Sequence, residues 1–165
     1  MSMMDQLLYI KTFRESQAQT TMLRCRADHL EAQAQEQACR EALERFVLQA
    51  REDEIRWYRE LCDRLVKLSD IESLQQDIAI LRAEEVARED EVKAKIAQTA
   101  AAREALTAST TALREASAAR NKFEELRRRE RDAVARESER REELELEEVA
   151  GNRRDREEEV SFEDV

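Results

Sequence analysis

The chain contains a single glycine and no proline in 165 residues. Proline interrupts helices and glycine supplies tight turns, so both residue types mark breaks in regular structure. A globular domain of this length needs many turns, and their near absence therefore indicates a few very long helices. Charged residues make up 41% of the chain and aromatic residues 4%. That balance covers the outside of thin helices but does not fill a thick core.

Apolar residues recur at spacings of three and four along both halves of the chain, which is the helical period. The repeat is visible in Trp57, Leu61 and Leu65, and again in Ile78 and Leu81. A helix buries such a stripe against another helix. The sequence therefore predicts an all-α fold, a two-helix antiparallel coiled-coil hairpin.

The best candidate for the turn is the segment around Ser69 and Asp70. Ser69 with Glu72 three residues later fits a capping box at the start of a second helix. We therefore predict that residues 1–150 form the hairpin. Arm one covers residues 2–68, the turn lies at about 69–70, and arm two covers residues 70–150.

A hairpin folded at this turn also predicts which residues face each other. Their numbers add up to about 139 if the two arms run antiparallel. This rule pairs Leu43 with Ile96 and places Phe46 near Val92. Gly151 is a natural residue to end a helix. The remaining segment, residues 151–165, is acidic and is predicted to be a disordered tail.

Composition excludes several classes of function. A net charge of −10 opposes binding to nucleic acid. No run of 18 apolar residues occurs, so we expect no insertion into a membrane. The three cysteines and the one histidine fit no metal-ligand spacing, and one glycine cannot build a phosphate-binding loop. We therefore expect no catalytic site, cofactor or metal, and a function that depends on surfaces.

Two segments are more apolar than a simple hairpin requires. Near the N-terminus, Leu8, Tyr9 and Phe13 cannot all face one partner helix, so some of them should meet another protein. At the start of the second arm one stripe faces the first arm, and Ile80 lies off the stripe and should be exposed. The stripe consists of Ile71, Leu74, Ile78 and Leu81.

These segments also carry a family resemblance. Residues 7–18 resemble the N-terminal pattern LLxIKxxRxxxA of the YscO/FliJ family, the central stalk proteins of type III secretion and flagellar export ATPases. Residues 66–82 resemble the turn and early second helix of that family, with an LxxEIAxLR-like core in which Asp77 replaces the usual glutamate. The injectisome branch is the more similar one.

The resemblance implies a monomeric, non-catalytic stalk at the cytoplasmic face of the inner membrane. Such a stalk links a hexameric ATPase to the cytoplasmic domain of the membrane export gate, and members of the family also handle export chaperones. Carried over to this sequence, the ATPase-binding residues are Leu7, Leu8, Ile10, Lys11 and Arg14. The gate-binding residues are Leu74, Ile78, Leu81 and Arg82.

Two other classes of protein remain compatible with the pattern. One is a prefoldin-like holdase chaperone, which would oligomerise through additional β-structure. The other is a purely structural dimeric coiled coil, in which each chain forms one continuous helix and Ser69 and Asp70 lie in its middle.

Overall fold

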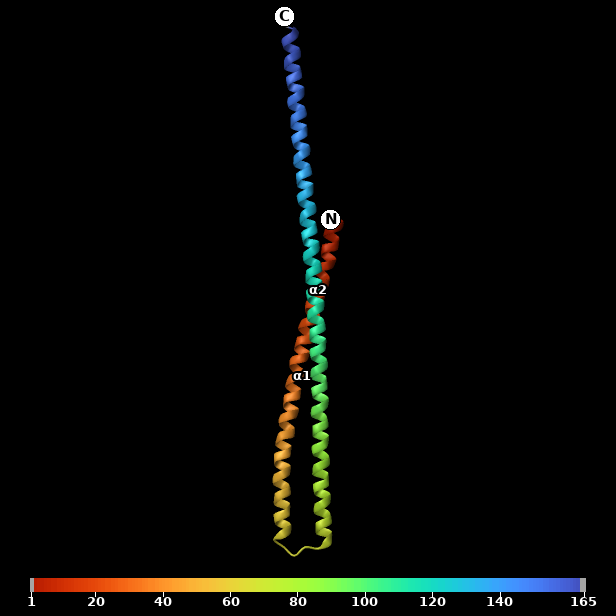
Figure 1. Cartoon of the computed structure of the whole chain (residues 1–165), viewed down its shortest axis with the longest axis vertical. Coiled ribbons are helices and arrows are strands. Elements are labelled where there is room, and N and C mark those ends of the chain that lie inside the picture. Colours follow the sequence, from red (N-terminus) through yellow and green to blue (C-terminus); the bar gives the residue numbers. More distant parts are fainter. Residues whose placement is uncertain (1, 164–165) are drawn as a thin grey trace. The chain divides into compact units, whose positions relative to one another are not determined.

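The computed structural model describes residues 2–163, and side chains up to residue 160. Two helices account for nearly all of these residues: α1 (Met3–Cys62) and α2 (Leu68–Glu163), joined by residues 63–67. The helices pack antiparallel (Figure 1), and no strand occurs between residues 2 and 163. The predicted fold class is therefore confirmed. The break at residues 63–67 rules out one continuous helix per chain.

Both helices begin with a carboxylate that caps the first turn. At the start of α1, the Asp5 amide donates to the Ser2 hydroxyl over 3.1 Å, and the Ser2 amide donates to the Asp5 carboxylate over 3.2 Å. This reciprocal pair satisfies two amides that have no partner within the helix. At the start of α2, the Lys67 amide donates to Asp70 over 3.1 Å. The Asp70 amide donates to the Lys67 carbonyl over 3.0 Å.

The predicted turn at residues 69–70, with Ser69 as its cap, is wrong. Arm one ends at Cys62 instead of residue 68, and arm two begins at Leu68 instead of residue 70. Asp70 occupies the third helical position, where its carboxylate reaches back to Lys67. Trp57 on α1 and Leu74 on α2 line one groove beside the turn.

Moving the turn also shifts the pairing of the two helices by one to two helical turns. Ala32, for example, contacts Thr99, where the rule predicts residue 107. Leu43 lines a groove together with Val92, not with Ile96 as expected, and Ile96 is 39% exposed. The Phe46 ring lies 4.6 Å from the Arg88 guanidinium, one helical turn before Val92. The pairing rule is therefore wrong in register, although its antiparallel sense is right.

The chain divides into two compact units. The first unit consists of Met1–Ser16 and Glu115–Val165, and the second of Gln17–Arg114. The core of the second unit is thin. Its least exposed residues are Ala50, Leu74, Val92, Thr99 and Ser109. Small side chains let the helices approach closely there: the Thr99 hydroxyl on α2 lies 3.2 Å from the Ala32 carbonyl on α1 and 3.0 Å from its own Lys95 carbonyl.

The predicted end of the second helix at residue 150 and the disordered tail over 151–165 are not found. α2 continues to Glu163, and Asp164 and Val165 lie outside the described residues. Gly151 keeps a negative φ, so it does not end the helix in the left-handed conformation that favours glycine. Beyond it, the Arg153 and Glu157 side chains form an i,i+4 ion pair at 3.5 Å, which supports the helix locally.

Candidate interaction surfaces

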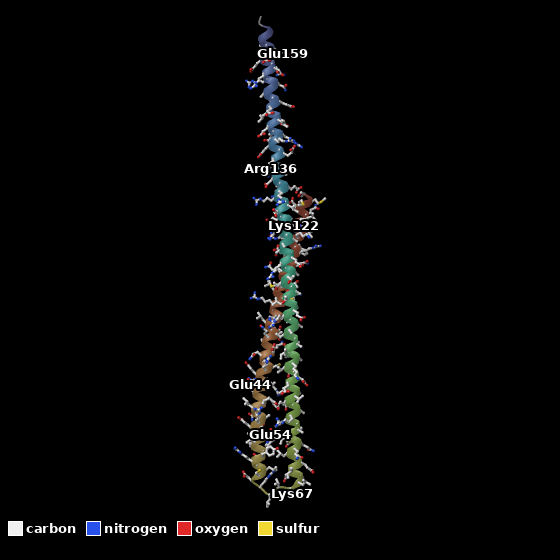
Figure 2. The ribbon with its side chains drawn as sticks, in the orientation of Figure 1. Glu44, Glu54, Lys67, Lys122, Arg136 and Glu159 are labelled. Carbon is white, nitrogen blue, oxygen red and sulfur yellow. The ribbon has the colours of Figure 1, made fainter. Side chains whose placement is uncertain are left out.

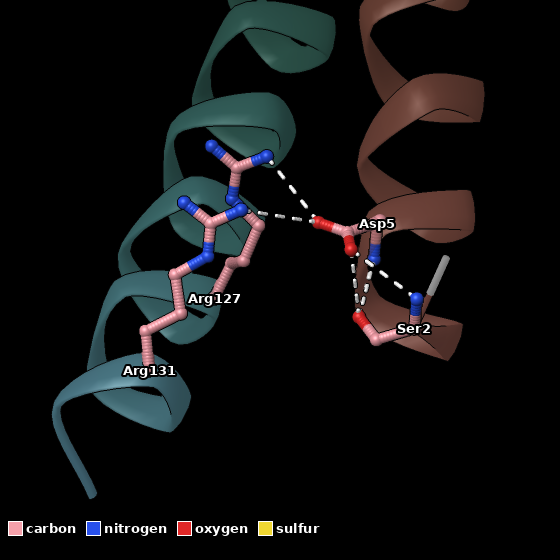
Figure 3. Close-up of polar contacts among 4 residues, drawn as sticks. All are labelled: Ser2, Asp5, Arg127 and Arg131. Carbon is pink, nitrogen blue, oxygen red and sulfur yellow. Dashed lines mark hydrogen bonds and ion pairs between the residues drawn. The ribbon is translucent and has the colours of Figure 1, made fainter. Parts of the chain in front are cut away.

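In the first unit, Asp5 joins the start of α1 to α2. One carboxylate oxygen lies 3.4 Å from Arg127 and 3.8 Å from Arg131, and the other accepts from Ser2 (Figure 3). The hydrogen bonds from the Ser2 amide and hydroxyl hold the pKa of Asp5 below its ordinary value, and Arg131 and Arg127 lower it further. The same carboxylate therefore caps α1 and fixes its register on α2.

Further along α1, two charged residues face α2. Glu15 lies 2.5 Å from Arg120 and accepts a 2.9 Å hydrogen bond from Ser117. The Lys11 ammonium lies 5.1 Å from the centre of the Phe123 ring, a cation–π distance. These contacts hold the N-terminal turns of α1 on α2 mainly through charge and not through a deep apolar seam.

The residues predicted to bind an ATPase lie on two sides of α1. Leu7, Leu8 and Lys11 are half-buried on the side that faces α2. Ile10, which is 45% exposed, and Arg14 point to solvent.

Two aromatic residues share this exposed side of α1. Tyr9 is 71% exposed and Phe13 is 55% exposed, while Leu8 is turned inward. The prediction that these three residues cannot all face α2 is confirmed. Together with Ile10 and Arg14, these aromatics form what we call the N-terminal face. Tyr9 and Phe13 are not among the residues that the family resemblance assigns to the ATPase, although their spacing of four places them side by side on one side of the helix.

The residues predicted to bind an export gate lie mostly between the two helices. Leu74 is only 9% exposed, and Ile78 and Leu81 are half-buried. Arg82 is exposed, but it forms an ion pair with Glu54 at 3.1 Å. Their positions therefore favour a role in holding α2 against α1.

The exposed apolar residues at this end surround the turn. Leu65 is fully exposed at 102% and Leu68 is 72% exposed, while Val66 and Ile71 are partly exposed. We call these four residues the turn surface. Lys67 lies at the same end of the second unit (Figure 2). Ile80, at 63%, is exposed as predicted. Leu65 and Val66 were expected inside a helix but lie in the connection between α1 and α2, so the turn surface did not follow from the sequence pattern.

Beyond the start of α1, the α2 helix of the first unit has its side chains in solvent, as Arg136 and Glu159 show (Figure 2). Val134 is 65% exposed. Arg140 and Arg141 both pair with Glu137, at 3.2 and 3.3 Å. This part of α2 has a charged surface, and the ion pairs at Glu137 join residues of the same helix.

Across residues 2–160, no three His, Cys, Asp or Glu side chains are placed to share a metal ion. Within the same range, no helix is long and apolar enough to cross a membrane.

Comparison with known proteins identifies one family. The family model for the type III secretion protein YscO matches residues 4–152. The crystal structure of the type III secretion protein YscO from Vibrio parahaemolyticus resembles this structure with a TM-score of 0.82 and 26% sequence identity. The similarity covers 88% of this chain and 92% of that chain. A search of curated proteins gives no match. The matched residues include both the N-terminal face and the turn surface.

Proposed function

Since the chain belongs to the YscO family of type III secretion proteins, we propose that it is the non-catalytic central stalk of the secretion ATPase. In this role it links the hexameric ATPase to the membrane export gate at the cytoplasmic face of the inner membrane. It acts as a monomer and assists in handling export chaperones. The observation that carries the proposal is that each of the two units exposes its own apolar surface.

The N-terminal face binds the ATPase. Tyr9 and Phe13 are large rigid anchors of the kind that dominate protein interfaces, and Arg14 adds a charge beside them. Leu7, Leu8 and Lys11, which pack toward α2, hold this face in position. A single stalk inside a six-fold ring meets six equivalent surfaces in turn, so its contacts must be few and easily exchanged. A small aromatic patch on a charged helix satisfies that requirement.

The turn surface binds the export gate. Its four apolar side chains cost free energy while they face water, and a partner that covers them recovers about 25 cal/mol for each Å² of apolar area. Leu74, Ile78 and Leu81 serve this contact indirectly, because they fix the start of α2 and thereby the position of Leu68. Arg82 stabilises the same region through its ion pair with Glu54.

The test compares one variant of each surface against both partners. Y9S/F13S should weaken binding to the purified ATPase by about tenfold or more and leave gate binding unchanged. L65S/L68S should do the reverse. Binding is measured by surface plasmon resonance with the ATPase hexamer and with the cytoplasmic domain of the gate.

The matched control is Leu30→Ser, since Leu30 is a 58% exposed leucine on α1 that belongs to neither surface. It should leave both affinities unchanged. Equal losses from both double variants, or a loss from the control, would show that the effect comes from general unfolding and would refute the assignment of surfaces.

A further inference from the structure

The first turns of α1 pack on α2 without a buried core. We call residues 3–16, the part of α1 that belongs to the first unit, the N-terminal strap. The apolar residues of the strap that face α2, Leu7 and Leu8, are only half-buried. Among residues 2–160, the five least exposed residues all lie in the second unit; they are Ala50, Leu74, Val92, Thr99 and Ser109. Apolar burial therefore holds the strap on α2 only weakly.

Charged groups of the strap contact α2 at intervals along its length. The contacts are Asp5 with Arg127 and Arg131, Lys11 with the Phe123 ring, and Glu15 with Arg120. The side chains of Glu15 and Arg120 are 23% and 32% exposed, so water and ions reach this pair. Salt shortens the range of such attractions, from about 30 Å at 0.01 M to about 3 Å at 1 M. The strap is therefore held by contacts that respond to ionic strength.

Release of the strap from α2 would change the N-terminal face. A helix shorter than about 12–15 residues is marginal in water when it has no tertiary contacts, and the strap has about this length. A released strap therefore frays from its N-terminus. Tyr9 and Phe13 lie side by side only while the strap is helical, because the helix brings residues four apart together. Fraying would separate these two aromatic side chains.

We propose that the charged contacts of the strap form an electrostatic clasp that regulates the N-terminal face. When the clasp is closed, the strap is a helix on α2 and presents Tyr9 and Phe13 on one side. When the clasp is open, the strap frays and the N-terminal face is lost. The effect on ATPase binding rests on the proposed function, whereas the opening of the clasp does not depend on it.

The first test is hydrogen exchange of the full chain at about 0.02 M and about 0.5 M salt. The protection of amides 7–16, taken relative to their intrinsic exchange rates, should fall about tenfold at the higher salt. This is the range expected when two or three partly exposed charged contacts are screened together. Protection of amides 74–92 should change by less than about twofold, because Leu74 and Val92 are buried there.

A charge exchange then tests whether Glu15 and Arg120 act through their charges. In low salt, E15R and R120E should each lower the protection of amides 7–16 by about tenfold, because an attraction becomes a repulsion. E15R/R120E restores opposite charges and should recover most of the protection. The matched control is R129E, the same change of charge at an arginine of α2 that pairs with Glu125 of its own helix. It should leave the protection of the strap unchanged.

Binding to the purified ATPase tests the regulatory role. R120E should weaken this binding by about tenfold although Tyr9 and Phe13 are unchanged, and E15R/R120E should restore it. The clasp is overturned if strap protection does not depend on salt, or if E15R/R120E protects the strap no better than R120E. Its regulatory role is overturned if R120E opens the strap and Y9S/F13S weakens ATPase binding, but R120E does not. Full ATPase binding by Y9S/F13S, with protection restored in E15R/R120E, would instead refute the proposed function and support the clasp.

Discussion

Leu74 and Leu65 lie at the same end of the second unit, yet the structure assigns them opposite roles. Leu74 is 9% exposed, whereas Leu65 is 102% exposed. Truncating a buried leucine to alanine costs about 2–5 kcal/mol of unfolding free energy. Leu74 and Trp57 line a groove that opens to solvent. We therefore expect water and a shift of the Trp57 ring to fill part of the cavity that Leu74→Ala creates. We therefore expect Leu74→Ala to cost about 2 kcal/mol, at the low end of that range.

Leu65→Ala should behave differently, because no buried area is removed. Its unfolding free energy should stay within about 0.5 kcal/mol of the parent value. For a chain of this size, each kcal/mol lowers the melting temperature by about 2–4 °C. The melting temperature of Leu74→Ala should therefore lie about 4–8 °C below that of the parent chain. The melting temperature of Leu65→Ala should equal that of the parent chain. Gate binding, by contrast, should fall for Leu65→Ala.

The assay combines circular dichroism with fluorescence in urea. Trp57 is the only tryptophan of the chain and lines the same groove as Leu74, so its emission reports on the region that is changed. Leu74→Met serves as control, since a change that conserves volume costs less than about 1.5 kcal/mol. The reasoning is refuted if Leu65→Ala destabilises the chain as much as Leu74→Ala, or if Leu74→Ala leaves stability unchanged and abolishes gate binding.

Three further predictions follow from individual contacts. Because the pKa of Asp5 is lowered in the folded chain, its stabilisation is present above the ordinary value of 3.8 and is lost as pH falls through the lowered value. The protection of amides in the first turns of α1, taken relative to the intrinsic exchange rate at each pH, should therefore fall in acid, and Asp5→Asn should remove that pH dependence. Thr99→Val should cost about 1 kcal/mol in urea unfolding, since the hydroxyl contacts Ala32 across the helices and Ala32 keeps its own helical hydrogen bond. Amides of residues 132–160 should exchange faster than those of residues 74–114, because the side chains in the former stretch are exposed almost throughout.

Each of these has an outcome that contradicts it. Equal acid sensitivity of the parent and Asp5→Asn would mean that other carboxylates hold the start of α1. An unchanged stability of Thr99→Val would show that close packing alone, without the hydroxyl, joins the helices at this point. Strong exchange protection over residues 132–160 would require a contact for this part of α2 beyond those of its own helix.

The sequence by itself determined the class of fold. Without proline and with one glycine, the chain has few means of interrupting a helix, and its apolar residues follow the helical period. The exposure of Ile80 and the outward position of Tyr9 and Phe13 also followed from that period, since residues off the facing stripe have nothing to pack against.

Only the tertiary structure decided where the chain turns and which residues meet. The local pattern suggested Ser69 as the cap of the second helix, whereas in the folded chain the Asp70 carboxylate accepts from the Lys67 amide. A displacement of the turn by a few residues changes every pairing along the hairpin. It also moves Leu65 from a helix into the exposed connection. Local sequence fixes the helices because their hydrogen bonds are local, whereas the register between them depends on the summed fit of side chains far apart in the chain.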